Sequence, residues 1–189
     1  MNTDIFQGEK VYLAAEEPEP LAEAFSRWMQ DSEYFRFLDS DPPRLWSVRQ
    51  EKEWMEKGLE KDEPDDFFFA IKSRADDRLL GFIALFDLSF SHGDSLVAIA
   101  LGEREYWGQG YGTDAMRSLL RYAFQELNLR RISLLVFEYN TRAIRSYEKA
   151  GFLPEGRMRG MMLREGRRWD WLLMGILREE WQQKEQEWT

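Results

Sequence analysis

Three glycines at alternate positions, Gly108, Gly110 and Gly112, lie between two segments of regular structure. Residues 95–101 are predicted to form a buried strand because they are mostly Leu, Val, Ala and Ile. After the glycines, Asn128 can end a helix whose apolar face is formed by Met116, Leu119, Leu120, Ala123 and Leu127. The first-turn amides of a helix have no partner within the helix, and the helix dipole favours negative charge there. This arrangement predicts a site for an anion such as a phosphate.

The spacing of these glycines differs from that of both common phosphate loops. A dinucleotide-binding loop has Gly-x-Gly-x-x-Gly, and a P-loop ends in Gly-Lys followed by Ser or Thr. Taken alone, the glycines are also typical of a turn that leads a strand into a helix. A second motif is needed to decide between the two interpretations.

A second motif occupies residues 140–152, with the pattern Asn-x-x-Ala-x-x-x-Tyr-x-x-x-Gly-Phe. Asn140 is a typical helix-capping residue, and Gly151 suits the left-handed position at which many helices end. Tyr147 lies two helical turns after Asn140, so both side chains fall on the same side of the predicted helix. The segment therefore places an amide and a phenol on the same side of one predicted helix.

In this order and at this distance, the two motifs resemble the GNAT superfamily of acyl-CoA-dependent N-acetyltransferases. The branch they resemble most contains ribosomal-protein N-terminal acetyltransferases and spermidine acetyltransferases. The resemblance is strongest over residues 95–152 and extends loosely over the whole chain. It implies an α/β fold of the α+β type, with a mixed, mostly antiparallel central sheet, one splayed pair of strands and helices on both faces. It also implies acetyl-CoA as the co-substrate.

The resemblance further implies which residues bind the coenzyme. Backbone amides of the glycine loop would bind the pyrophosphate, because glycines without Cβ atoms allow a close approach. The pantetheine arm would lie beside the preceding strand, where a free amide would serve the oxyanion, and Asn140 would hydrogen-bond the arm. The residues implied are Ile99, Ala100, Leu101, Trp107, Gly108, Gln109, Gly110, Tyr111, Gly112, Thr113, Asn140, Ala143 and Tyr147.

Tyr147 is the catalytic residue that the resemblance implies, because in the family this hydroxyl protonates the departing sulfur. A phenol suits the role, since its ordinary pKa of about 10 keeps it protonated at neutral pH. The alternative is an aromatic side chain that packs in the core with its hydroxyl at the surface. The register of Tyr147 with Asn140 and Gly151 favours the catalytic role.

Two positions depart from the family pattern. Trp107 stands where many members have arginine or glutamine, so a side-chain contact to phosphate is lost there. Leu96 stands near the point where many relatives have a glutamate that acts as the base for the amine, and leucine cannot accept a proton. Glu103, Glu105 and Asp94 are candidates by their proximity in the sequence, and a chain of ordered water is another. The sequence assigns none of them.

Length and composition favour one domain over residues 1–189, because 43% hydrophobic residues are enough for one buried core. The chain has no cysteine, which excludes a thiol nucleophile, a disulfide framework and a zinc-thiolate site and favours the cytoplasm. We expect no metal site. No segment resembles a signal peptide or reaches membrane-spanning length.

The formal charge of −9 argues against broad nucleic-acid binding, which uses Lys and Arg to neutralise phosphates. One local run of arginines favours the solvated face of a hairpin over a basic patch: Arg157, Arg159, Arg164, Arg167 and Arg168. The single histidine, His92, lies in a turn of Ser, Gly and Asp, which favours a solvated loop residue over an acid–base catalyst.

Alternation, helical spacing and turn residues predict the other elements. We expect strands at 9–14, 67–71, 79–88 and 131–137, a helix beginning near Pro20, a helix after the capping box Ser47-x-x-Gln50, and a hairpin of 155–163 with 168–177. Residues 39–43 and 62–66 are predicted loops, 34–38 are rich in aromatic residues, and 178–189 form a charged tail.

The favoured function is direct acetyl transfer to a primary amine on a small molecule, a polyamine or a polypeptide N-terminus, and a homodimer is an open expectation. Six aromatic residues are candidates for the acceptor cleft, although their spacing is more typical of a core: Trp28, Tyr34, Phe35, Trp46, Trp169 and Trp171. The alternative function is a coenzyme-binding or interaction module on the same fold that has lost turnover, as the missing strand glutamate suggests.

Overall fold

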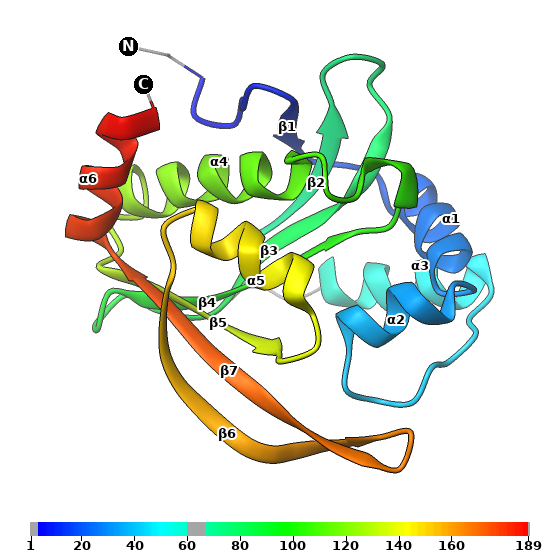
Figure 1. Ribbon diagram of the computed structural model, residues 1–189. Coiled ribbons are helices and arrows are strands. Elements are labelled where there is room, and N and C mark those ends of the chain that lie inside the picture. Colours follow the sequence, from blue (N-terminus) through cyan, green and yellow to red (C-terminus); the bar gives the residue numbers. More distant parts are fainter. Residues whose placement is uncertain (1–3, 60–66, 189) are drawn as a thin grey trace.

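The computed structural model describes residues 4–59 and 67–188 (Figure 1). The strands are β1 Val11–Ala14, β2 Phe67–Ser73, β3 Leu79–Ser89, β4 Asp94–Leu101, β5 Arg131–Phe137, β6 Leu153–Arg164 and β7 Arg167–Leu177. The helices are α1 Pro18–Trp28, α2 Ser32–Leu38, α3 Val48–Leu59, α4 Tyr111–Gln125, α5 Thr141–Lys149 and α6 Arg178–Trp188, with a short 3-10 helix at Arg104–Tyr106. The predicted mixed α/β architecture is confirmed.

The strands form one sheet in the order β1-β2-β3-β4-β5-β7-β6. All neighbours are antiparallel except β4 and β5, which are parallel and pair only from Asp94 with Arg131 to Leu96 with Ser133. Beyond this point the described parts of the two strands diverge, and α5 lies in front of the gap (Figure 1). The sheet therefore contains a splayed pair of strands, as the resemblance implies.

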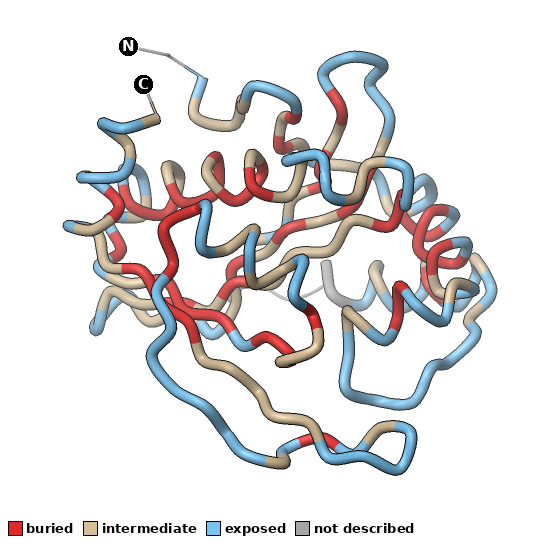
Figure 2. The backbone as a smooth tube through the Cα atoms, viewed as in Figure 1, coloured by how far each residue is buried: buried red, intermediate tan, exposed pale blue. Residues whose placement is uncertain are grey.

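Helices cover both faces of the sheet, with buried residues between the layers (Figure 2). On one face, α4 packs Met116 and Leu119 against strand residues such as Ile83. On the other face, α1 and α2 pack Phe25 and Tyr34 around a smaller core. This packing brings the C-terminal ends of β4 and α2 close to α5 and to the start of α4.

Local signals begin and end several helices where the sequence predicts. Ser47 and Gln50 form the capping box, in which the Ser47 amide donates to Gln50 Oε1 (3.1 Å) and the Gln50 amide donates to Ser47 Oγ (3.4 Å). Asn128 adopts a left-handed φ of +55° after α4, and Gly151 a φ of +96° after α5. The Phe152 amide then donates to the Tyr147 carbonyl (3.0 Å), the bond expected of a glycine-terminated helix.

Two segments differ from the expectation. Residues 32–38 form a helix because Asp31 caps it by accepting from the Tyr34 amide (3.3 Å), and the aromatic residues bury one helix face. The charged tail is also a helix, α6, because Trp181 is buried against Phe124 with ring centroids 5.3 Å apart. The predicted loop at 62–66 lies outside the described residues.

Candidate functional site

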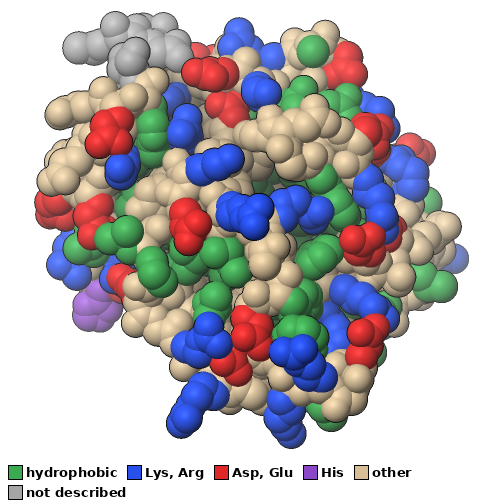
Figure 3. Space-filling model, viewed as in Figure 1, with side chains coloured by type: hydrophobic (Ala, Val, Ile, Leu, Met, Phe, Trp, Pro, Cys, Tyr) green, Lys and Arg blue, Asp and Glu red, His purple; other side chains and the backbone are tan. Residues whose placement is uncertain are grey.

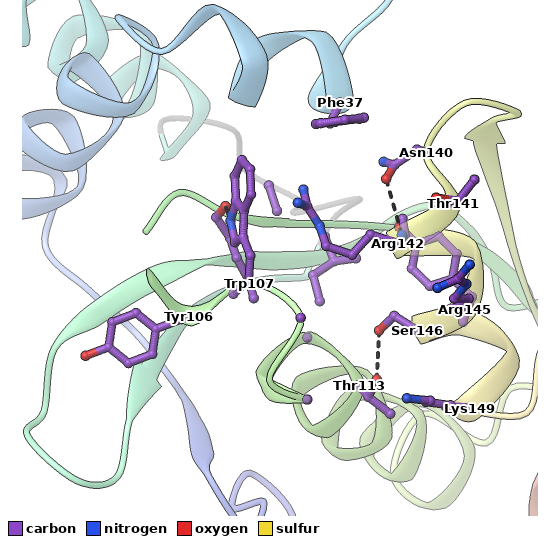
Figure 4. Close-up of a pocket in the computed structure, with 18 of the residues that line it drawn as sticks. Phe37, Tyr106, Trp107, Thr113, Asn140, Thr141, Arg142, Arg145, Ser146 and Lys149 are labelled. Atoms are coloured by element: carbon purple, nitrogen blue, oxygen red, sulfur yellow. Dashed lines mark hydrogen bonds between the residues drawn. The ribbon is translucent and has the colours of Figure 1, made fainter. Parts of the chain in front are cut away.

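A cavity of about 340 Å³ lies at the end of β4, between α2, α5 and the start of α4 (Figure 4). All but two of the predicted coenzyme-binding residues line it. The exceptions are Gln109, whose carbonyl accepts from Lys10 Nζ (2.9 Å), and Tyr111, whose ring packs against Tyr106 (5.0 Å between centroids). The two sequence motifs therefore meet in one cavity, as the resemblance implies.

The glycine loop has the backbone that an anion site requires. Gly108 and Gly110 have φ values of +72° and +90°, which side-chain-bearing residues rarely adopt. Gly110 is the N-cap of α4, and its carbonyl accepts the first intrahelical bond, from the Asp114 amide (3.0 Å). In the described chain no hydrogen bond uses the amides of Tyr111, Gly112 and Thr113. These three amides are available to a phosphate.

Side chains of α4 fix this helix start in place. The Asp114 carboxylate accepts from the backbone amides of Lys10 (2.8 Å) and Val11 (3.0 Å), which joins α4 to β1. Thr113 Oγ1 and Ser146 Oγ share a hydrogen bond of 2.8 Å, which joins α4 to α5. The glycine loop is thus held by neighbours on both sides.

The end of β4 presents backbone groups to the gap between the splayed strands. The Gly102 amide donates to the Leu80 carbonyl on β3 (2.8 Å), and bonding direction alternates along an antiparallel strand. The amide and carbonyl of Ala100 therefore face β3, whereas those of Ile99 and Leu101 face the gap. Of the three predicted strand residues, Ala100 therefore turns its backbone groups toward β3 rather than toward the gap.

The backbone of Leu101 faces the gap but is already partly hydrogen-bonded. Its carbonyl accepts a hydrogen bond from Trp107 Nε1 (2.7 Å), which ties the start of the glycine loop to the strand. Ile99 is the strand residue whose amide and carbonyl both face the cavity. The Ile99 amide is consequently the best-placed donor for a carbonyl oxygen that gains negative charge.

Asn140 and Tyr147 face the cavity from α5. Asn140 is 7% exposed and caps the helix, because its Oδ1 accepts from the Ala143 amide (3.2 Å). Its amide nitrogen donates to no group among the described residues and stays available to a ligand. The Tyr147 ring packs on Phe152 with centroids 6.1 Å apart, and its hydroxyl likewise has no partner in the described chain.

Burial raises the pKa of Tyr147 to about 12, because ionisation would place a charge in a poorly solvated site. The hydroxyl therefore keeps its proton throughout the physiological range. It can donate to a sulfur that leaves with negative charge.

The three candidate bases lie outside the cavity. Glu103 is 6% exposed and accepts from Trp28 Nε1 (2.9 Å), Arg27 (2.5 Å) and Arg78 (2.6 Å). Burial alone would raise the pKa of Glu103, but these hydrogen bonds and positive charges lower it below its usual value. Glu105 pairs with Arg78 (2.8 Å). Asp94 lies at the other end of β4, and no described lining residue is Asp, Glu or His.

The contacts of Glu103 predict a structural role. We expect Glu103→Gln to lower the free energy of unfolding by about 1–2 kcal/mol, because two guanidinium groups lose a charged acceptor but stay partly solvated. The lowered pKa means that this stabilisation is present above the unfolded-state pKa and is lost as the pH falls through the folded-state pKa. Urea unfolding at pH 7 and pH 3 measures both effects. Equal stability of the two proteins at pH 7 would contradict the assignment.

Cationic side chains of α5 also line the cavity, and the sequence analysis did not identify them. Arg142, Arg145 and Lys149 recur at spacings of three and four residues, so they share one side of α5, and all three line the cavity. That spacing is the signal that could have found them. Lys and Arg side chains gather over the middle of this face, where α5 runs (Figure 3).

Arg142 spans the cavity from α5 toward Trp107 (Figure 4). Its guanidinium lies 3.8 Å from the Trp107 ring centroid and 5.1 Å from that of Phe37. Partial burial lowers the pKa of Arg142, and no carboxylate in the described chain pairs with it. A guanidinium held by two aromatic rings with its donors free suits an anionic or carbonyl-bearing ligand.

Of the six aromatic candidates for the acceptor cleft, only Tyr34 is among the described lining residues. Trp28 is buried in the smaller core, Phe35 is also buried, and Tyr34 is buried in the smaller core and also touches the cavity. Trp46, Trp169 and Trp171 do not line the cavity.

The other predicted surface features are local. His92 is exposed in its turn, as expected. Arg157 pairs with Asp170 (2.7 Å) on the hairpin of β6 and β7. The described residues contain no group of three or more His, Cys, Asp or Glu arranged for a metal ion. None of the described helices is long and apolar enough to cross a bilayer.

Comparison with known proteins gives the family. The sequence model of the acetyltransferase (GNAT) domain matches residues 11–153. A prophage-derived uncharacterized N-acetyltransferase of Bacillus subtilis is 32% identical over 183 residues, which cover 96% of this chain and 98% of that protein. A spermidine N(1)-acetyltransferase of Vibrio cholerae is 30% identical over 107 residues, 57% of this chain and 61% of that protein.

Solved structures agree on the fold. A spermidine N-acetyltransferase from Vibrio cholerae, solved in complex with CoA and spermine, superposes with a TM-score of 0.79 at 23% identity, over 91% of this chain and 98% of that one. The fold, the cavity and the match over residues 11–153 lead to one conclusion: the chain belongs to the GNAT family of acetyltransferases and is an N-acetyltransferase.

Proposed function

We propose that this N-acetyltransferase takes its acetyl group from acetyl-CoA and transfers it directly to a primary amine. The observation that carries the proposal is the cavity that joins the free amides of Gly112 and Thr113 to the Ile99 amide and the Tyr147 hydroxyl. These groups suit, in order, a pyrophosphate, a thioester carbonyl and a leaving thiolate. The chain has no cysteine for an acyl-thioenzyme, which supports direct transfer.

The residues have separate tasks in this proposal. Bound acetyl-CoA would supply an activated acetyl group on a thioester. The first-turn amides of α4 and the cations of α5 would hold the diphosphate, and the Asn140 amide nitrogen would orient the pantetheine arm. The Ile99 amide would stabilise negative charge on the carbonyl oxygen, and Tyr147 would donate to the sulfur.

A thiol-release assay with acetyl-CoA tests the proposal against polyamines, aminoglycosides, amino-acid amides and N-terminal peptides. We expect at least one amine to raise the release of thiol above the rate without an acceptor, together with a mass increase of one acetyl group on that amine. Binding of the coenzyme with no acceptor-dependent release would contradict the proposal.

The proposal predicts a pH dependence set by the acceptor. No described lining residue is a carboxylate or imidazole, so the amine must lose its proton to solvent before it attacks. We expect kcat/KM to rise tenfold per pH unit up to the pKa of the acceptor. Tyr147 adds no loss of activity until the pH approaches its pKa of about 12. An acidic limb that stays at the same pH for acceptors of different pKa would instead reveal a base on the protein.

The second candidate is a coenzyme-binding module on the same fold without turnover. The absence of a carboxylate or imidazole among the described lining residues favours it, because no side chain there accepts the proton of the amine. Such a module would bind acetyl-CoA and release no thiol with any acceptor. Free Tyr147 and Asn140 groups facing the cavity favour the enzyme.

A further inference from the structure

The C-terminal end of α2 is bonded to the tip of the β6–β7 hairpin, far away in the sequence. The Arg164 guanidinium donates to the Arg36 carbonyl (2.6 Å), to the Asp39 carbonyl (2.8 Å) and to the Tyr139 hydroxyl (2.6 Å). The Arg36 side chain pairs with Glu165 (2.5 Å). We call these contacts of Arg164, Glu165, Arg36, Asp39 and Tyr139 the Arg164 clasp.

The clasp matches the chemistry of a helix end. The last carbonyls of a helix have no intrahelical partner and carry the negative end of its dipole, so a guanidinium binds them well. A helix as short as α2 is unstable by itself and takes its position from such contacts. An arginine also fastens its other end, because Arg104 Nη2 donates to Oδ1 of the capping Asp31 (2.6 Å).

The helix held in this way forms one wall of the cavity. Phe37 and Leu38 line it, and Phe37 lies across from α5 (Figure 4). The Phe37 ring contacts Trp107 (6.4 Å between centroids) on one side and Tyr139 (5.9 Å) on the other. Tyr139 is itself part of the clasp. The wall of α2 therefore continues without a break in its contacts from the glycine loop to the hairpin.

This wall stands where the acceptor must approach. With the coenzyme at the glycine loop, an amine that attacks the thioester has to come from the other end of the cavity, which Phe37 and Leu38 of α2 line. The clasp joins α2 directly to the hairpin. A bulky chain attached to the amine would meet Phe37 there, and behind it Tyr139 and Arg164, which contact Phe37 and the end of α2.

We propose that the Arg164 clasp closes the acceptor end of the cavity, so that the enzyme acetylates small primary amines in preference to polypeptide N-termini. Arg164 is a positioning residue, because it acts through α2 and does not touch the reacting atoms. This inference rests on the proposed acetyl transfer and adds the acceptor class to it.

Matched acceptors test the inference. An amino-acid amide and a twelve-residue peptide that begins with the same residue carry the same reacting group and differ only in bulk. We expect the unmodified enzyme to favour the amide at least tenfold in kcat/KM, averaged over several first residues. Arg164→Ala removes three hydrogen bonds from a charged donor, and we expect it to lower the amide's kcat/KM about tenfold, mainly through KM, and to reduce the preference over the peptide to about one.

Control variants separate positioning from a general loss of structure. Arg159→Ala removes an exposed arginine from the same hairpin and should leave both rates unchanged. Arg164→Lys keeps the charge and one donor group, and should restore part of the preference. Hydrogen exchange of the α2 amides should accelerate in Arg164→Ala and stay unchanged in Arg159→Ala.

The outcomes distinguish the inference from the function on which it rests. Equal or better acetylation of the peptides by the unmodified enzyme would overturn the inference and leave acetyl transfer intact. Failure of every amine would overturn the proposed function. In that case the exchange measurement still judges the clasp: α2 amides that exchange at the same rate in Arg164→Ala and the unmodified protein would overturn it.

Discussion

Replacement of Tyr147 by phenylalanine should lower kcat at least 100-fold and leave the affinity for the coenzyme nearly unchanged. The hydroxyl lines the cavity without a partner in the described chain, and general acids contribute about 10²–10⁴ to rate. The ring packs on Phe152 and persists in the variant, so the fold and the cavity wall are kept. Steady-state kinetics with the best acceptor and calorimetric titration of CoA measure the two quantities.

A matched control uses a second tyrosine near the glycine loop. The Tyr111 side chain faces Tyr106 and Lys10, outside the cavity, so Tyr111→Phe should keep full activity. A further check uses acetyl thioesters with thiols of different acidity. The defect of Tyr147→Phe should shrink as the leaving thiol becomes more acidic, because a better leaving group needs less help from a donor. Undiminished turnover in Tyr147→Phe would remove this residue from the mechanism.

Replacement of Gly110 by valine should weaken coenzyme binding about 100-fold. Gly110 has φ +90° at the N-cap of α4, a conformation that a β-branched residue adopts only under strain. Added bulk is not the cause, because the nearest atom to a Cβ at this position is Lys10 Cε at 4.0 Å. A shift of the loop would misdirect the amides of residues 111–113, each of which would otherwise donate a charge-assisted bond to phosphate.

Gly166 provides the control for backbone strain. It has φ +71° in the exposed turn between β6 and β7, with open space around it. Gly166→Val should lower thermal stability as Gly110→Val does, but should bind CoA with the affinity of the unmodified protein. Calorimetric titration of both variants makes the comparison. Tight binding of CoA by Gly110→Val would refute the phosphate site at this loop.

Much of the fold could be predicted because its signals are local. The capping box at Ser47 and Gln50, the left-handed Asn128 and Gly151, and the apolar face of α4 each act within a few residues. The 3-10 helix at Arg104–Tyr106 and the short helix α2 were not predicted from the sequence. The α2 helix depends on aromatic side chains that become buried only against α1 and the sheet.

The candidate site divides in the same way. Gly110 and the pair Asn140 and Tyr147 carry their geometry in their own backbone or helix, so the sequence alone identified them. Three other features depend on partners far away in the chain. The backbone of Ala100 faces β3, the Glu103 carboxylate is held by Trp28 and arginines, and Arg142 reaches the Trp107 ring. Periodicity gives the face of an element but not its neighbour.

The sequence by itself determined the family, the glycine loop and the helix register that places Tyr147 with Asn140, because short-range conformational preferences and fixed helical spacing encode them. The tertiary structure alone decided which strand amide is free, which carboxylates are tied up in ion pairs, and how α2 is fastened over the cavity by arginines from other elements. Those features arise from long-range contacts between side chains and backbone groups, and such contacts exist only once the chain has folded.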